Sequence, residues 1–376
     1  MEEDRPVRIA SYNVENLFRR PTVFMDAEGD ANEDVIAAYT KLTELLAQES
    51  YAGDEDEIVE RLEVLGLKWV DENNTAVIRE TRGQLLKRTR KPKAAHVDPE
   101  GRADWIGWVE LKRRELSSQA TENTAAIIGE VNPDVLAVVE AEDRLTLDRF
   151  NEYVLQKVNG WMFRHTMLVD GNDERGIDVG AMAKRSFRIG RLCSHIDDFK
   201  EGEEEKDKPG RIFSRDCPEY EVPTPDGGSL LLMVNHFKSK IGGGEERRTE
   251  QAEQVAKIYG ERRDQGWERI VVAGDLNDTP GSEPLIQLTS KTDLEDAWEL
   301  DGFDTGGEDS THSGGDRFDY IFLSPELGKA MKAGGVNRRG IWKASHKDDE
   351  DKMLSTITEE DEAASDHAAL WVELDV

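Results

Sequence analysis

The sequence is poor in cysteine and has no long apolar run. Its 376 residues include two cysteines, Cys193 and Cys217, and neither a CxxC pair nor a cluster of cysteine with histidine. A structural zinc site is therefore not expected, whereas a disulfide between the two cysteines and two free thiols both remain open. No stretch of 18 apolar residues occurs, so we expect no transmembrane helix and no membrane partner.

The N-terminal residues lack the features of a secretory signal. Met1–Asp4 are acidic and lead directly into a predicted strand, without the basic region and apolar core that a signal peptide requires. We therefore expect a cytoplasmic protein, or a secreted one if the sequence is the mature form of an exported protein. Nothing in the sequence indicates an obligate protein partner.

Basic residues are also in short supply. Lys and Arg total 49 against 80 Asp and Glu, which gives a formal net charge of −31. Because phosphate binding depends on Lys and Arg, this balance argues against a large non-specific nucleic-acid surface. A small local basic patch remains compatible with it. With 37% hydrophobic residues, the chain can still build a sizeable core in no more than two or three domains.

Several short apolar runs end in polar residues. The clearest is Ile270–Ala273, followed by Gly274, Asp275 and Asn277. An apolar run bounded by turn residues is typical of a buried strand, and polar residues at the carboxyl end of a strand are well placed to line a site above a sheet. The alternative is an Asx-rich turn without chemistry.

The same pattern recurs in three other places. The predicted strands 7–12, 135–139 and 230–234 are followed by Asn13, by Glu140, and by Asn235, His236 and Lys238. Each polar group alone could be an ordinary loop cap. Their recurrence favours a common site built from strand ends.

Two residues far apart in the chain form a natural pair. Asp319 is embedded in the predicted strand 316–323, and a buried carboxylate needs a partner. His367 precedes the last predicted strand. A carboxylate can fix the tautomer of an imidazole and support its charged form.

Other segments carry weaker signals. Arg175, beside Gly176, offers a bidentate fork for phosphate, or is a stray arginine in a hairpin turn. The stretch from about 30 to 90 has helical spacing of apolar residues, a further helix is predicted over 73–87, and a long one over 102–131. This predicted helical stretch ends in the most basic part of the chain, which is either a solvated face or a surface that contacts a polyanion. Its cations are Arg79, Arg82, Lys87, Arg88, Arg90, Lys91 and Lys93.

Taken in order, these segments resemble the endonuclease/exonuclease/phosphatase superfamily of DNase I-like enzymes. The matching stretches are Ser11–Phe18, Asp134–Glu140, Arg175–Met182, Val234–Lys240, Gly274–Asn277, Arg317–Leu323 and Ser365–His367. Within that superfamily the sequence looks most similar to a bacterial subgroup of extracellular-nuclease-like proteins. The resemblance implies an α/β fold, a four-layer sandwich of two mixed β-sheets flanked by helices. It would form a single domain over 1–376 with a helical insertion at about 20–100.

The resemblance also implies roles for individual residues. Glu140, Asn13 and Asp366 would hold Mg²⁺, or Mn²⁺ with Ca²⁺ possible, through oxygen donors. Asp275 would activate the attacking water, and Asn277 would hold the phosphate or a second metal. The other implied groups act on the phosphate or anchor it: His367 supported by Asp319, His236, Arg175, Asn235 and Lys238.

The implied activity is metal-dependent hydrolysis of a phosphodiester in nucleic acid. The same chemistry on a small phosphate ester or a phospholipid head group stays open, as does a catalytically silent scaffold that binds a partner. In this family an acid often supports the second histidine, and Asp178 is a candidate for that role.

Overall fold

The computed structural model describes residues 5–15, 29–73, 75–90, 92–98, 100–111, 118–173, 176–202, 210–240, 244–346 and 349–376, with only the backbone for 29–34 and 36. By its contacts the chain divides into two compact units: Met1–Phe18 with Leu116–Val376, and Arg19–Glu115. Among the helices of the described residues, none has both the length and the apolar character needed to cross a bilayer.

The larger unit is built on two sheets. The first has seven strands in the order β14 (Phe303–Asp304), β16 (Met331–Asn337), β17 (Ala369–Leu374), β1 (Val7–Asn13), β6 (Val135–Ala141), β8 (Asp178–Ala183) and β7 (His165–Leu168). The second has six, in the order β13 (Glu295–Asp296), β15 (Asp319–Leu323), β12 (Ile270–Asp275), β11 (Ser229–His236), β10 (Glu219–Pro223) and β9 (Leu192–Cys193). Both sheets are mixed, because β1 runs parallel to β6 and β11 parallel to β12 while most other neighbours are antiparallel.

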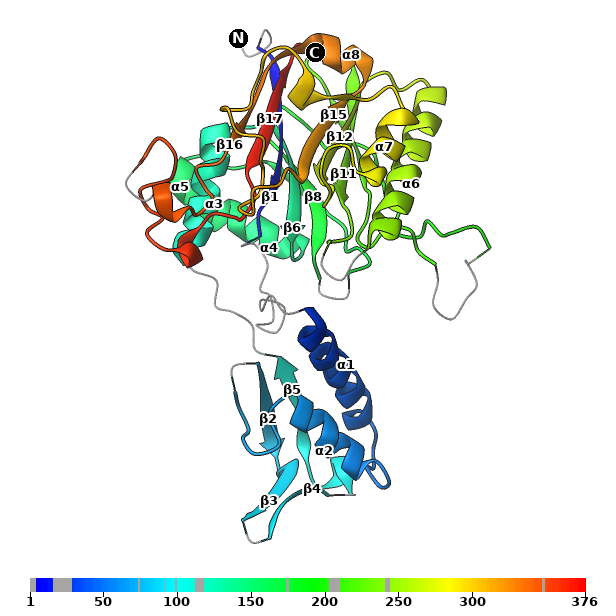
Figure 1. Ribbon diagram of the computed structural model, residues 1–376, viewed down its shortest axis with the longest axis vertical. Coiled ribbons are helices and arrows are strands. Elements are labelled where there is room, and N and C mark those ends of the chain that lie inside the picture. Colours follow the sequence, from blue (N-terminus) through cyan, green and yellow to red (C-terminus); the bar gives the residue numbers. More distant parts are fainter. Residues whose placement is uncertain are drawn as a thin grey trace. The chain divides into compact units, whose positions relative to one another are not determined.

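Helices cover the outer faces of the two sheets (Figure 1). On the side of the first sheet lie α3 (Ser118–Val131), α4 (Arg144–Arg149) and α5 (Gln156–Asn159). On the side of the second sheet lie α6 (Glu245–Asp264) and α7 (Glu283–Ser290), and α8 (Pro325–Ala330) follows β15.

Alternation along the strands creates three apolar layers. Side chains of alternating residues point to opposite faces of a sheet. One set from both sheets forms the central core, including Val139, Leu232, Val271 and Ile321. The other sets pack beneath the helices of each side. This confirms the four-layer α/β sandwich of two mixed sheets.

The smaller unit differs from the sequence prediction. Its helices α1 (Gly29–Leu46) and α2 (Glu55–Val64) agree with the helical spacing. The helix predicted over 73–87 is wrong, because this segment forms strands that pair as hairpin-like ribbons: β2 (Ala76–Arg82) with β5 (Ile106–Leu111), and β3 (Leu86–Arg90) with β4 (Lys93–Val97). The insertion is therefore not purely helical, and the helix predicted over 102–131 is reduced to α3.

The smaller unit has an apolar core of its own. It joins both helices to the ribbons through buried side chains such as Leu42, Leu62, Ile78 and Trp105. Arg102, which lies between β4 and β5, also contacts the end of α1, because its Nε donates to the Leu46 carbonyl over 2.9 Å.

Candidate active site

Strand alternation directs several predicted residues into the space between the two sheets. In β11, Leu232 and Val234 belong to the central core, so His236 points the same way. The same parity applies to Asp275 after Ala273 in β12 and to Asp319 before Ile321 in β15. These polar side chains therefore gather where the central core ends.

Glu140 reaches this space through an irregularity in β6. Val139 faces the central core, and regular alternation would turn the next residue toward the helices. A β-bulge lies between Val139 and Ala141, and Glu140 adopts a positive φ of 66°. As a result its Oε1 lies 3.7 Å from Nε2 of His236. A bulge that re-aims one side chain is a recurrent feature beside active sites.

Backbone strain is concentrated at the same place. Of the four described non-glycine residues with positive φ, Glu15, Glu140 and Asn277 lie at this cluster, and Asn132 lies elsewhere, between α3 and β6. Such conformations cost about 1–3 kcal/mol each and are retained where surrounding contacts enforce them. Gly274 serves the close approach of β11 and β12, because a Cβ there would lie 1.9 Å from the Asn235 carbonyl oxygen.

Asp275 lies at the centre of the cluster and is 1% exposed. Its Oδ1 accepts a hydrogen bond from the Asn277 backbone N–H over 2.8 Å. Its Oδ2 accepts from the side-chain amides of Asn13 and Asn277 over 3.2 and 3.3 Å. Nε2 of both His236 and His367 lies 3.7 Å from the same oxygen. Side chains from β1, β11, β12 and the segment just before β17 thus meet at one carboxylate.

His367 is oriented by Asp319. Its Nδ1 lies 2.8 Å from Oδ2 of that carboxylate. Thr311 holds the carboxylate in turn, because its Oγ1 donates to the same oxygen over 2.7 Å. Oδ1 of Asp319 is buried and has no hydrogen-bond partner among the described residues. The arrangement leaves Nε2 of the imidazole directed at Asp275.

Burial and neighbouring charges shift the pKa values of Asp275 and His367. Burial raises the pKa of Asp275 to about 7, although the nearby His367 opposes the shift. Burial alone would lower the pKa of His367, but Asp319, Asp275 and Asp366 together raise it well above its usual value. An excess of carboxylates therefore favours an imidazolium at His367 and a proton-accepting carboxylate at Asp275 near neutral pH.

The end of β1 is tied to the segment before β17 beside this cluster. Ser365 donates from Oγ to the Asn13 carbonyl over 2.7 Å and accepts from the His367 backbone N–H. The backbone N–H of Asp366 donates to Oε2 of Glu15 over 3.1 Å. Asn13 is consequently held close to Asp366 and His367, although more than 350 positions separate it from them in the sequence.

The donor set suits a divalent ion. Ligand atoms of Asp275, Asp319 and His367 lie within 4.8 Å of one another, as do those of His312, Asp366 and His367. Carboxylate and amide oxygens dominate the surroundings, which a hard cation prefers. Among the described residues, no Lys or Arg forms an ion pair with Asp275 or Asp319. The residues present therefore fit a metal that would neutralise the excess charge.

Not every predicted residue joins the cluster. Asn235 has the opposite strand parity to His236 and lies with Met233 on the helix side, where its side-chain amide donates to the Met233 carbonyl over 3.5 Å. The side chain of Lys238 is exposed just past the end of β11. Arg175 lies outside the described residues. Asp178 is buried at the start of β8, where it accepts a hydrogen bond from the Gly171 N–H over 2.8 Å.

One residue at the site was not found from the sequence. His312 forms an isolated β-bridge with His367, and the centroids of their rings are 4.9 Å apart. Its Nε2 lies 3.5 Å from Oδ2 of Asp366. It belongs to a loop with no apolar run before it, so the strand-end signal was absent.

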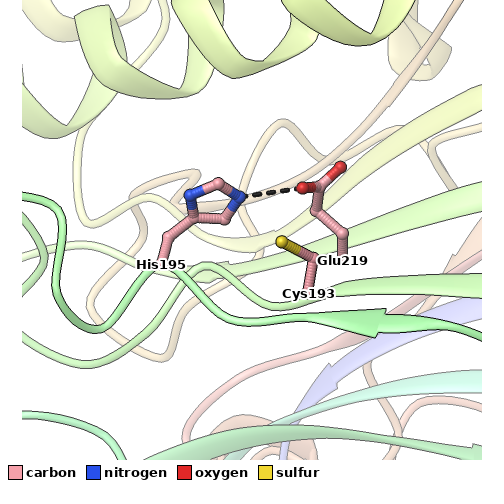
Figure 2. A group of neighbouring side chains, drawn as sticks. All are labelled: Cys193, His195 and Glu219. Atoms are coloured by element: carbon pink, nitrogen blue, oxygen red, sulfur yellow. Dashed lines mark hydrogen bonds and ion pairs between the residues drawn. The ribbon is translucent and has the colours of Figure 1, made fainter.

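A second buried histidine cluster lies in the same unit. Cys193, His195 and Glu219 face one another between β9 and β10 (Figure 2). Nε2 of His195 lies 2.8 Å from Oε1 of Glu219, and Nδ1 lies 3.0 Å from Asp198. Arg262 binds both oxygens of Glu219 over 2.5 and 2.7 Å. This cluster already contains its own cation. Both Cys193 and Cys217 are free thiols.

The chain belongs to the endonuclease/exonuclease/phosphatase family. A sequence model of that family matches residues 109–367, which include every element of the cluster except β1. Members of this family typically hydrolyse phosphate esters and generally require a divalent metal ion. The match is to the family as a whole rather than to its extracellular-nuclease-like subgroup.

Solved structures with a similar fold have low sequence identity to this chain. A Bacteroides thetaiotaomicron family protein is 17% identical with a TM-score of 0.48 and coverage of 68% of this chain and 88% of that one. A mannosyl-6-phosphatase of the same organism is 18% identical, with a TM-score of 0.48 and coverage of 68% and 90%. Truncated Caenorhabditis elegans TDP2 is 18% identical, with a TM-score of 0.45 and coverage of 69% and 90%. These similarities do not bear on the substrate of this chain, and no curated protein sequence matches it.

Proposed function

We propose that the protein is a Mg²⁺- or Mn²⁺-dependent phosphodiesterase that hydrolyses nucleic acid. The observation that carries the proposal is the convergence of Glu140, Asp275 and His367, with their partners, on one buried and negatively charged place. In an ion-pair network that only stabilises the fold, basic groups balance the carboxylates. In the cluster around Asp275, the carboxylates outnumber the cationic groups.

The residues of the chain divide the work of hydrolysis. Asp275 orients the attacking water and takes its proton, which its pKa of about 7 suits. The amides of Asn13 and Asn277 hold that carboxylate in place. His367, charged and fixed by Asp319, donates from Nε2 to the oxygen on which negative charge develops. His236 faces the same place from β11 and donates to the phosphate from another side.

A bound metal would complete the site. Glu140, Asn13 and Asp366 would hold it, and it would stabilise the negative charge of the phosphoryl transition state. Ca²⁺ could occupy the same oxygen donors. Arg175 and Lys238 remain candidate contacts to the substrate phosphate.

Hydrolysis of defined esters tests the proposal. Plasmid, single-stranded DNA and RNA are incubated with Mg²⁺ or with EDTA, in parallel with bis-p-nitrophenyl phosphate and p-nitrophenyl phosphate. We expect cleavage of a polynucleotide and of the diester with Mg²⁺, and loss of both in EDTA and in Asp275→Asn. Turnover of the monoester alone would instead assign the same site to a small phosphate ester, and turnover of no ester would support a silent scaffold.

A further inference from the structure

The smaller unit contains a basic segment in a strongly acidic protein. Residues 68–93 include eight Lys or Arg against three Asp or Glu, whereas the whole chain has a net charge of −31. Such a reversal of charge within one short segment points to contact with an anion. A solvated face is the alternative, and the arrangement of the side chains distinguishes the two.

The β3–β4 hairpin sorts its residues between two faces. Leu86 pairs with Val97, Arg88 with Ala95, and Arg90 with Lys93, so these three pairs share one face. The first pair is buried in the core of the unit, and the last pair is exposed near the turn. The opposite face includes Lys87, whose charge is neutralised by Asp98 over 2.6 Å.

Arg88 fixes an aromatic loop against the first face. Its guanidinium donates to the carbonyls of Lys68, Leu67 and Val70 over 2.8–2.9 Å and to the carboxylate of Asp71 over 2.6 Å. Four hydrogen bonds from one side chain therefore fasten the loop 67–71 to the hairpin. The loop thereby presents Trp69, 40% exposed, and Val70, 45% exposed, to solvent.

Two lysines lie near the exposed indole ring of Trp69. Nζ of Lys93 lies 4.3 Å from the centroid of the Trp69 ring, and Nζ of Lys68 lies 6.0 Å from it. Lys68 is paired with Glu63. Arg90 and Lys93 form no ion pair with any described residue. Lys93 therefore lies beside the exposed indole without a counter-charge among the described residues, and Arg90 is its partner across the β3–β4 ladder.

We propose that Trp69, Arg90 and Lys93 form a binding site for single-stranded nucleic acid. A base stacks on the indole, and the flanking phosphates meet the two cations, which is the combination that sequence-tolerant single-strand binding uses. A base-paired strand keeps its bases stacked inside the duplex, so the ring selects an unpaired one. The inference rests on the proposed function, because it assigns the substrate class of the same enzyme, and it requires no particular placement of the two units.

Binding by the full chain tests the inference without catalysis. Fluorescence anisotropy with a labelled 12-nucleotide thymidine strand is measured in EDTA at several salt concentrations. Trp69→Ala should weaken binding at least about fivefold, since stacking on one aromatic side chain contributes that much or more. The double variant Arg90→Gln/Lys93→Gln should make the logarithmic salt slope shallower by about 1.4, because each single-strand phosphate contact contributes about 0.7.

Matched controls separate the site from general effects. Trp108→Ala removes another exposed tryptophan, 52% exposed on β5, and Lys87→Gln removes a cation from the opposite face of the same hairpin. Both should bind the strand within about twofold of the wild type. Equal losses in Trp69→Ala and Trp108→Ala, or an unchanged salt slope in the double variant, would overturn the inference. So would absence of binding in the wild type, or wild-type binding to vesicles containing phosphatidylserine but not to the strand.

A small diester keeps the two proposals apart. All these variants should hydrolyse bis-p-nitrophenyl phosphate at the wild-type rate, because the reporter has a single phosphate and neither a nucleobase to stack nor flanking phosphates for the two cations. If the diester is cleaved but Trp69→Ala binds the strand normally, the binding site is refuted and the enzyme proposal stands. If the strand binds through Trp69 but no diester is cleaved, the enzyme proposal fails alone.

Discussion

Two buried carboxylate–histidine clusters occur in the larger unit, and they differ in how their charge is balanced. Around His195, the carboxylates of Glu219 and Asp198 are matched by the imidazole and by Arg262. Around His367, Asp275 and Asp319 have no Lys or Arg partner among the described residues. Both clusters could be mistaken for metal sites from residue types alone.

The difference lies in which cluster still needs a cation. The donors of Glu219 are occupied by Arg262, and an added metal would have to displace a buried guanidinium. Burial lowers the pKa of His195, but Asp198 and Glu219 outweigh it and raise the pKa to about 9, so its nitrogens carry protons rather than free lone pairs. Uncompensated carboxylates therefore mark a functional site better than a His–Asp–Glu composition does.

The largest contrast should appear in turnover. Asp275→Asn and His367→Ala should each lower the kcat for bis-p-nitrophenyl phosphate by about a thousandfold or more, since they remove the base and the donor to developing charge. The matched variant His195→Gln should retain kcat within about twofold. Turnover near the wild-type level in either site variant would remove that residue from the mechanism.

Stability should show the opposite sensitivity. Glu219→Gln leaves the buried Arg262 without its counter-charge and should cost about 3 kcal/mol in urea unfolding. Asp275→Asn removes one negative charge from a cluster that has an excess of carboxylates. In EDTA above pH 7 the substitution should therefore leave the free energy of unfolding unchanged or raise it. A large loss of stability in Asp275→Asn would show that its charge is compensated after all.

The pH dependence of stability sharpens the contrast further. The pKa of His195 is raised from 6.5 to about 9 in the folded state. A raised pKa means that the folded state binds the proton more tightly, so the added stability is complete below pH 6.5 and is lost as pH rises through about 9. The advantage of wild type over His195→Gln should shrink by about 3 kcal/mol across that window. An advantage independent of pH would contradict a charged His195.

Ligand-induced stabilisation should give the smallest effect. Mn²⁺ at ten times its dissociation constant should stabilise the wild type and His195→Gln by about 1.4 kcal/mol. Glu140→Gln should need a higher Mn²⁺ concentration for the same rise in Tm. Equal Mn²⁺ titrations of Glu140→Gln and the wild type would exclude Glu140 as a ligand.

The central strands and their polar ends were predictable for a simple reason. Runs such as Ile270–Ala273 are apolar on both faces because they are covered by a sheet on one side and helices on the other. The ribbons of the smaller unit lack that signal, since most residues of β2 from Arg79 onward are exposed. Their charged side chains follow no period that separates a strand from a helix.

The convergence of the strand-end side chains was predictable in outline but not in its finer geometry. Adjacent strand residues point to opposite faces, so His236 and Asn235 could not both line one site, and parity alone would have separated them. Parity fails for Glu140, because the bulge that turns it inward depends on its pairing with β8. A loop brings His312 to His367, and no local sequence pattern predicts such a contact.

Hydrolysis of bis-p-nitrophenyl phosphate before and after metal removal tests the central claim most directly. We predict that dialysis against EDTA abolishes turnover, that Mg²⁺ or Mn²⁺ restores it, and that Glu140→Gln requires more metal for the same recovery. Full turnover in EDTA, or no turnover with any divalent ion, would contradict a metal-dependent diesterase built on Asp275 and His367.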